Sequence, residues 1–155
     1  QVIDKPVELM DLMPTFLDIA GVDIPDSVDG DSLLPLMRDS SSEWRTFVHG
    51  ECCTVPSANS GMQYVTDGKR KLVWFPGKDE QLFFDLEEDP EEMHNLIDDP
   101  SRAREIAGWR GHLIAQLGDR PEGFTDGETL IKQDGPTLSR LQHVIDEGQA
   151  IMDAE

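Results

Sequence analysis

The stretch TDGKRKLVWFPGKDEQLFFDL, residues 66–86, decides the fold of this chain. It contains two runs rich in aromatic and aliphatic residues, 70–75 and 80–86, which is the composition of β-strands. The segment 76–79 between them contains Pro-Gly and has room only for a tight turn. Two strands joined in this way pair antiparallel, because a parallel pair needs a crossover of about a dozen residues or more.

A second hairpin precedes the first. The run GMQYVT, residues 61–66, is joined to 70–75 by the turn 67–69, which begins with Asp-Gly, a strong hairpin signal. A further strand-like run, RTFVHGEC, occupies residues 45–52. The pattern therefore predicts an antiparallel sheet of about four strands.

Helical signals follow the sheet. Asp99, followed by proline, suits the N-cap of a helix over about 100–118, whose apolar residues recur on one face. Asp89, followed by proline and then by Glu92 at the third position, has the spacing of a capping box and predicts another helix start. Residues 137–152 are predicted to form a last amphipathic helix.

Shorter helices are expected before the sheet. Pro14 fits the first turn of a helix that Gly21 would end. The segment SLLPLMR, residues 32–38, is predicted to form a short apolar helix or turn, and residues 39–46 a polar linker. The sequence thus predicts an α/β fold in which a small antiparallel sheet packs on one long helix.

The charge balance excludes two classes of partner. Thirteen Lys and Arg against 32 Asp and Glu give a formal net charge of −19. Nucleic acids and anionic membranes need a basic footprint, so neither is an expected partner. No apolar run approaches the roughly 18 residues of a membrane span. The acidic residues are spread along the chain, and a salt-rich source is a hypothesis that fits this distribution.

Four strings occur in order along the chain: VELMDLMPTFLDIAGVDIPDSVDGDSLLPLM at 7–37, WRTFVHGE at 44–51, TDGKRKLVWFP…EQLFFDLEEDPEEMHNL at 66–96 and WRGHLIAQLGDRPEGFTDGETL at 109–130. Together they resemble the C-terminal part of arylsulfatase-like sulfatases, in the alkaline-phosphatase-like superfamily. The resemblance covers roughly residues 6–131. It implies a parent enzyme that hydrolyses a sulfuric ester, either aryl or carbohydrate.

In this family the nucleophile is formylglycine, made from Cys or Ser within Cys/Ser-x-Pro/Ala-x-Arg, and the metal is usually Ca²⁺. Neither cysteine of this chain fits that motif. After Cys52, Thr54 occupies the Pro/Ala place, and after Cys53 that place holds Val55. We therefore expect the chain to contain no catalytic residue and no core metal ligand, and to be inactive alone.

The resemblance also implies a domain organisation. Residues 1–38 would end the catalytic domain, 39–131 would form the C-terminal subdomain, and 132–155 a helical tail. The expected partners are the N-terminal catalytic domain of the parent chain and a sulfated small molecule or carbohydrate. The first residue is Gln1 rather than Met, so we expect a piece of a longer polypeptide. Many relatives are exported, which makes export or a periplasmic location a hypothesis; the sequence itself assigns no compartment.

His49 and Glu51 are the first candidates for substrate binding. Side chains two residues apart share one face of a strand. At the mouth of a sulfate pocket, such a pair could bind a sugar or aryl hydroxyl, or hold His49 protonated toward an anion. The alternative is a strand-end histidine satisfied by neighbouring backbone.

Lys69 and Lys71, with Arg70 between them, are three consecutive cations in a very acidic chain. They could attract an anionic ester. The alternative is a solvent-facing hairpin whose lysines discourage edge pairing.

Two other functions stay open. The same superfamily includes phosphodiester and phosphonate monoester hydrolases, and the C-terminal strings occur with both chemistries. The other class is a binding or regulatory module without catalytic activity.

Overall fold

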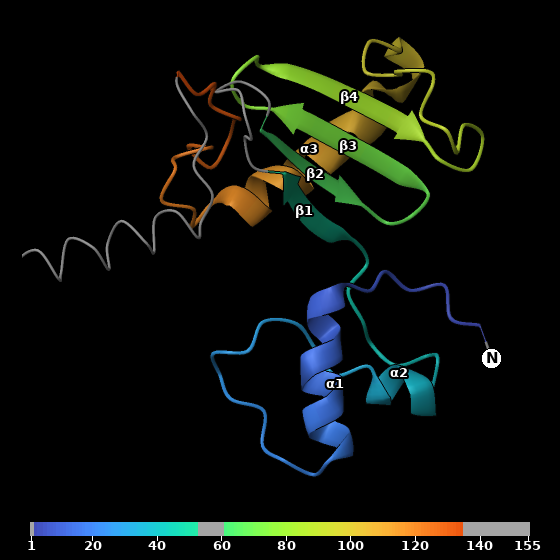
Figure 1. Cartoon of the computed structure of the whole chain (residues 1–155). Coiled ribbons are helices and arrows are strands. Elements are labelled where there is room, and N and C mark those ends of the chain that lie inside the picture. The colour runs from blue at the N-terminus through green and yellow to red at the C-terminus, as the bar shows by residue number, and fades with distance from the viewer. Residues whose placement is uncertain (1, 53–60, 135–155) are drawn as a thin grey trace, which may run out of the picture. The chain divides into compact units, whose positions relative to one another are not determined.

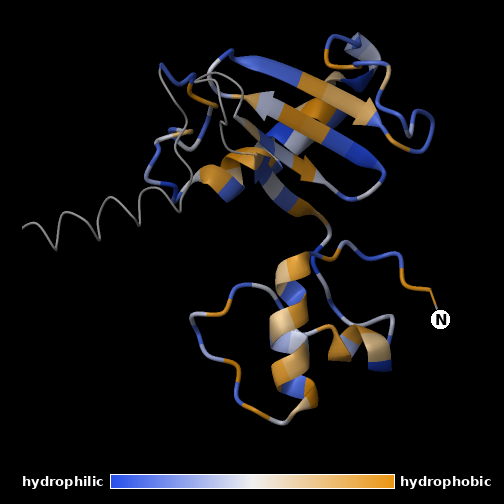
Figure 2. Cartoon of the chain, in the orientation of Figure 1, coloured by the Kyte–Doolittle hydropathy of each residue, from blue (hydrophilic) through white to orange (hydrophobic). Residues whose placement is uncertain are grey.

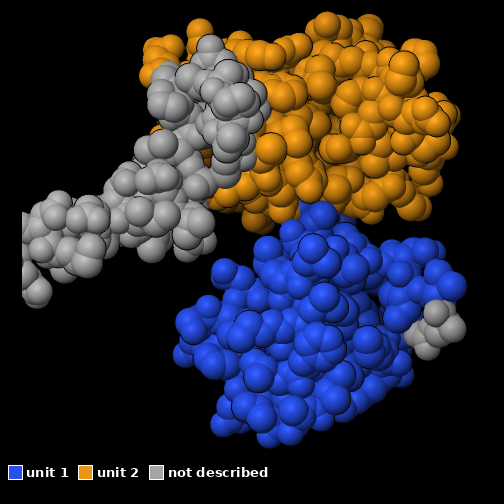
Figure 3. Space-filling model, viewed as in Figure 1, with its two compact units in different colours: residues 1–48 blue, residues 49–155 orange. Residues whose placement is uncertain are grey.

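The computed structural model describes residues 2–52 and 61–134 (Figure 1). The chain divides into two compact units, residues 1–48 and residues 49–155 (Figure 3). The domain boundaries expected from the sequence stay predictions, and the helix expected over 137–152 lies outside the described residues.

The second unit is built on a four-stranded sheet. Its strands are β1 (Val48–Cys52), β2 (Met62–Thr66), β3 (Arg70–Phe75) and β4 (Glu80–Asp85), in the spatial order β1-β2-β3-β4. β2 pairs antiparallel with β3, and β3 with β4. This is the predicted meander, with each strand formed inside its predicted run.

The helix after the sheet is also confirmed. A 3-10 turn (Pro100–Arg102) leads into α3 (Ala103–Leu117). Asp99 caps this start, because its Oδ1 accepts a hydrogen bond of 2.8 Å from the Ser101 backbone N–H. α3 lies across one face of the sheet, against β2 and β3 (Figure 1). The core between and around them consists of Val65, Leu72, Val73, Trp74, Phe83, Phe84, Ile106, Leu113, Leu117 and Phe124.

The predicted helix start at Asp89 is wrong. Residues 89–96 contain a turn at 90–91 and a bend at 94 but no helix, and Glu92 has a φ of 55°, in the left-handed region that a helix start does not use. The segment instead binds the edge of β4: the Leu96 N–H donates to the Phe83 carbonyl at 2.8 Å, and Asn95 Oδ1 accepts from the Phe83 N–H at 2.9 Å. Edge hydrogen bonds of β4 thus replace those that a helix would form.

The first unit consists of short helices. A 3-10 turn (Leu9–Asp11) continues into α1 (Leu12–Ile19), and α2 spans Leu34–Arg38. The helix begins before Pro14, which still lies in the first turn, where its missing N–H costs nothing. Gly21, with a φ of 68°, follows the helix as predicted.

Large apolar side chains of the first unit are exposed. Phe16 is 65% exposed and Leu9 86%. Figure 2 shows the hydrophobic colouring that runs along α1. The exposed set on and around this helix comprises Val7, Leu9, Met10, Leu12, Met13, Phe16, Ile19, Val22 and Ile24. Hereafter we call these residues the α1 apolar surface.

Within residues 2–52 and 61–134, none of the helices has the length and apolar character needed to cross a bilayer.

Candidate functional site

One face of β1 carries a chain of hydrogen-bonded polar side chains. His49 Nε2 lies 2.8 Å from Gln63 Oε1, and Gln63 Nε2 donates to Glu51 Oε2 at 3.1 Å. His49 and Glu51 therefore share a face of the strand, as predicted, but Gln63 of β2 lies between them. Gln63 is 2% exposed, so its amide depends on these partners. We call this arrangement the His49–Gln63–Glu51 chain.

The far end of this chain is fixed by Arg120, which follows α3. Arg120 Nη2 lies 2.9 Å from Glu51 Oε2 and 2.6 Å from Glu122 Oε1, and its Nε donates to Glu122 Oε2 at 3.1 Å. The hydrogen bond to Glu122, with the charge of Glu51, raises the pKa of Arg120 in spite of its burial. A guanidinium so held is a permanent donor to Glu51.

The opposite face of β1 explains why glycine separates the histidine from the glutamate. A Cβ at Gly50 would overlap the ring of Tyr64. The Tyr64 ring thus occupies the space that a side chain at position 50 would need. The His-Gly-Glu string places two polar groups on one face of β1 and leaves room for an aromatic ring on the other.

The structure does not bring Lys69 and Lys71 to the His49–Gln63–Glu51 chain. Lys71 Nζ lies 2.9 Å from Glu92 Oε1 and 5.2 Å from the centre of the Tyr64 ring. In the β2–β3 register Gln63 is opposite Trp74, so Lys71 is on the other face of the sheet from Gln63. Lys69, in the hairpin turn, is mostly exposed and lies 3.5 Å from Glu87.

Arg70, between the two lysines, belongs to a separate ion-pair cluster. It contacts Asp85 at 2.7 Å, Glu87 at 3.1 Å and Glu105 at 3.0 Å. Arg102 contacts Asp85 from the other side at 2.9 Å. This cluster joins the start of β3 and the end of β4 to the start of α3, which is a structural role.

Gln63 and Arg120 were not predicted from the sequence. Gln63 did carry a signal: it is two residues from the apolar Val65, so both lie on the face of β2 that packs inward. A polar residue on a buried strand face needs a hydrogen-bonding partner. Arg120 carried none, because the loop after α3 brings it to β1 across 69 residues of sequence.

The first unit has its own polar centre at Asp11, which is fully buried. Its carboxylate accepts from Arg45 at 2.6 Å and 3.0 Å, from the Glu8 N–H at 2.7 Å and from the Asp31 N–H at 3.0 Å. Burial alone would raise the pKa of Asp11. The hydrogen bonds and the charge of Arg45 outweigh burial, so the pKa is lowered.

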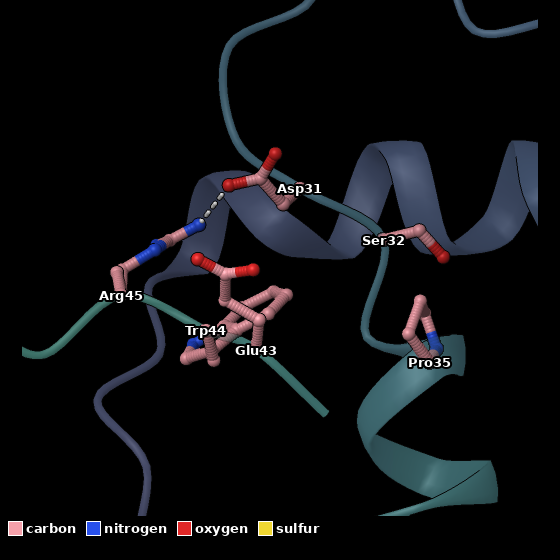
Figure 4. Close-up of a pocket in the computed structure, with 6 residues that line it drawn as sticks. All are labelled: Asp31, Ser32, Pro35, Glu43, Trp44 and Arg45. Atoms are coloured by element: carbon pink, nitrogen blue, oxygen red, sulfur yellow. Dashed lines mark hydrogen bonds and ion pairs between the residues drawn. The ribbon is translucent and has the colours of Figure 1, made fainter. Parts of the chain in front are cut away.

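An open depression of about 520 Å³ adjoins this centre, lined by Asp31, Ser32, Pro35, Glu43, Trp44 and Arg45. Figure 4 shows the Arg45 side chain directed at Asp31, an ion pair of 2.9 Å. Trp44 is fixed by a 2.8 Å hydrogen bond from its Nε1 to the Pro6 carbonyl. The polar groups that line the depression thus mainly hold the loops of the first unit together.

The carboxylates described above are bound by cationic side chains and backbone N–H groups. Asp11 is held by Arg45, and Asp85 by Arg70 and Arg102. In the residues that the structure describes, no three His, Cys, Asp or Glu side chains gather as a metal site. These residues therefore do not fit the calcium site that the sulfatase resemblance implies.

The family comes from comparison with known proteins. The model described as "N-sulphoglucosamine sulphohydrolase, C-terminal" matches residues 1–117. An arylsulfatase of Clostridium perfringens is 42% identical over 144 residues, which is 93% of this chain. The chain belongs to the sulfatase C-terminal family. It belongs to the alkaline-phosphatase-like superfamily, as the four sequence strings indicated.

Solved structures agree with this assignment. BT4656, in complex with its substrate D-glucosamine-2-N,6-O-disulfate, matches with a TM-score of 0.63, 27% identity and 70% of this chain. The phosphonate monoester hydrolase SpPMH from Silicibacter pomeroyi matches with a TM-score of 0.63, 25% identity and 84% of this chain. The sulfatase C-terminal part spans 29% of the C. perfringens arylsulfatase, 23% of BT4656 and 30% of SpPMH.

Proposed function

We propose that the polypeptide to which this chain belongs is an arylsulfatase-like sulfuric ester hydrolase. The observation that carries the proposal is the 42% identity to an arylsulfatase over 93% of this chain. The role of the chain within that enzyme is to pack against the catalytic part and to close the substrate pocket.

The partner of the first unit is the remainder of the parent polypeptide. The α1 apolar surface exposes nine large side chains from a segment of only 18 residues, 7–24. Monomeric proteins rarely leave a contiguous apolar patch of this kind open to water. Because the chain spans 29% of the arylsulfatase, the other part of such an enzyme is large enough to cover it.

The nucleophile and the metal would come from that same remainder. There, formylglycine would supply the nucleophile for the ester, and Ca²⁺ would supply positive charge toward the sulfate oxygens. The sequence around Cys52 does not match the formylglycine motif. This chain alone is therefore expected to lack hydrolytic activity.

Substrate contact is assigned to the His49–Gln63–Glu51 chain. Its polar groups are held by fixed hydrogen bonds on a strand, which suits the orientation of a hydroxylated substrate. The relative BT4656 was solved with a sulfated glucosamine as its substrate, which supports a sulfated carbohydrate as the substrate class here. Lys69 and Lys71 remain candidates for attracting an anionic ester, but away from the His49–Gln63–Glu51 chain, and an anion at Lys71 would have to compete with Glu92.

A phosphonate monoester is the second candidate substrate. SpPMH resembles this chain with the same TM-score as BT4656, and the similarity covers more of the chain. Sulfate and phosphonate monoesters share a tetrahedral anionic centre, so one C-terminal part can serve either.

The test is hydrolysis by the native polypeptide that contains this chain. It is assayed with 4-nitrophenyl sulfate and with a 4-nitrophenyl phosphonate monoester, each with Ca²⁺, and in parallel with the 155-residue chain alone. We expect the native polypeptide to prefer the sulfate ester and the isolated chain to be inactive. Preference for the phosphonate selects the second candidate, and activity of the isolated chain refutes the proposal.

The role of His49 is tested in the same assay. His49→Gln in the native polypeptide is expected to lower kcat/KM for a sulfated sugar at least about 10-fold, the loss of one good hydrogen bond to substrate. The matched control is His94→Gln, because the side chain of His94 is 80% exposed in a turn. Equal effects of the two substitutions would remove His49 from the site.

A further inference from the structure

The amide of Gln63 is buried between two ionisable side chains. Its oxygen lies 2.8 Å from His49 Nε2 and its nitrogen 3.1 Å from Glu51 Oε2. Gln63 is 2% exposed, so water does not provide alternative partners for either end. The direction of the amide therefore has consequences for both neighbours.

Glu51 determines this direction. An ionised carboxylate can only accept hydrogen bonds, so the group that faces it must be the NH₂ end of the amide. The reverse orientation would place two acceptor oxygens about 3 Å apart in a buried site, and would leave the amide oxygen of Gln63 without a donor there.

The orientation of Gln63 then fixes the histidine. With its NH₂ on Glu51, Gln63 presents only its carbonyl oxygen to His49, and an acceptor must be met by a donor. We infer that Gln63 is a positioning residue which, directed by Glu51, holds His49 in the tautomer with the hydrogen on Nε2. In the neutral form of that tautomer the ring lone pair is on Nδ1.

Neighbouring side chains hold the His49–Gln63–Glu51 chain in position on both faces of β1. Arg120 holds the same Glu51 Oε2 at 2.9 Å and is itself held by Glu122, which leaves Glu51 little freedom to turn away. On the opposite face, the Tyr64 ring lies over Gly50, between the two residues that β1 contributes to this chain. β1 and β2 are thus kept close without a side chain at position 50.

The consequence concerns the substrate contact and rests on the proposed function. Whichever group meets the Nδ1 edge of His49 encounters an acceptor when the ring is neutral and a donor when it is protonated. Gln63 and Glu51 therefore set the hydrogen-bonding polarity of His49 toward its partner, although neither needs to touch the substrate.

The direct test is nuclear magnetic resonance of the 155-residue chain with ¹⁵N-labelled histidine, at a pH where His49 is neutral. We expect a hydrogen on His49 Nε2 that exchanges slowly with water and shows a nuclear Overhauser effect to the Gln63 side chain. Slow exchange is the discriminating observation, since a free neutral imidazole also favours this tautomer. A hydrogen on Nδ1, or rapid exchange at Nε2, overturns the inference in the unmodified chain.

Two variants separate positioning from packing. Gln63→Met keeps the volume and removes the acceptor, so the protected Nε2 hydrogen should be lost. The exchange variant Gln63→Glu with Glu51→Gln keeps an acceptor toward His49 and a donor between positions 51 and 63, so it should preserve the protected hydrogen. The matched control is Gln81→Met, since Gln81 is opposite Trp74 on the same sheet face and its oxygen contacts Arg110. A protected hydrogen that persists in Gln63→Met overturns the inference.

Activity of the native polypeptide then distinguishes the two proposals. With sulfatase activity present, Gln63→Met should lower kcat/KM for the sulfated substrate, while the exchange variant Gln63→Glu with Glu51→Gln should retain more of it. If the native polypeptide hydrolyses no ester but the Nε2 hydrogen is protected and depends on Gln63, the proposed function fails and the tautomer assignment stands.

Discussion

The two units of this chain differ in how completely they bury their large apolar side chains. The second unit closes an apolar core in which Phe83, Trp74 and Leu72 are fully buried. The first unit buries Leu36 and the carboxylate of Asp11, but leaves Phe16 65% exposed. A unit built around a buried carboxylate, with large apolar residues outside, has the pattern of one layer of a core; in the function proposed above, the remainder of the parent polypeptide is the other layer.

The largest expected effect on stability comes from replacing one phenylalanine in each unit by alanine. Phe83→Ala should lower the free energy of unfolding of the second unit by about 3–5 kcal/mol, because it leaves a cavity in a closed core. The matched substitution Phe16→Ala should change the stability of the 155-residue chain by less than about 0.5 kcal/mol. Denaturant unfolding of both variants measures the difference.

The same two substitutions, Phe83→Ala and Phe16→Ala, should have a different relative cost in the native polypeptide. If the remainder of the enzyme covers the α1 apolar surface, Phe16→Ala should destabilise that longer protein by several kcal/mol, about as much as Phe83→Ala. No extra cost of Phe16→Ala in the longer protein would mean that this surface is not an internal interface.

The ion pair of the first unit gives the next effect. Arg45→Met leaves Asp11 buried without its charged partner, which costs up to about 3–5 kcal/mol, with the lower end expected because Arg45 is partly exposed. Amide hydrogen exchange should show that protection is lost in residues 2–48 and kept in the second unit. Arg38→Met is the control, since Arg38 lies exposed at the end of α2.

Glycine substitutions compare two sites within the second unit. Gly50→Ala should cost about 1–3 kcal/mol, because the added methyl overlaps the Tyr64 ring. In a Tyr64→Leu background that cost should fall. Gly108→Ala in α3, where nothing lies within 4 Å of the new methyl, should stabilise the chain by up to about 1 kcal/mol. Thermal unfolding of the four variants decides whether the ring is the obstacle.

The smallest expected effect is the response of the first unit to acid. The pKa of Asp11 is lowered in the folded state, so its contribution is complete above the unfolded value of about 3.9 and is lost as the pH falls through the folded pKa. Amide signals of the first unit followed from pH 6 downward should therefore weaken only in that acidic range. Asp11→Asn should reduce the pH dependence of these signals in the acidic range, whereas Asp26→Asn, at an exposed position, should not.

Much of the second unit could be predicted from its sequence, because hairpin signals act locally. The turn at 67–69 and the run 70–75 specify a strand pair without help from distant residues. Asp99 and Asp89 show the limit: both precede proline, but only Asp99 begins a helix, since the chain after Asp89 binds the edge of β4.

The candidate site was less predictable. The period of two along a strand placed His49 and Glu51 on one face correctly. The residue that joins them, Gln63, comes from the neighbouring strand, and Arg120 arrives from a loop after α3. Strand register and loop path depend on tertiary packing, which no local pattern records.

The most direct test of the central claim is the covalent structure of the native polypeptide, determined by intact mass and complete peptide mapping. As the C-terminal part of a sulfatase, this chain should be preceded by a longer segment that contains Cys/Ser-x-Pro/Ala-x-Arg, with its first residue present as formylglycine. A native polypeptide that begins at Gln1, or an upstream segment without that modified site, would contradict the assignment of sulfatase catalysis to the parent protein.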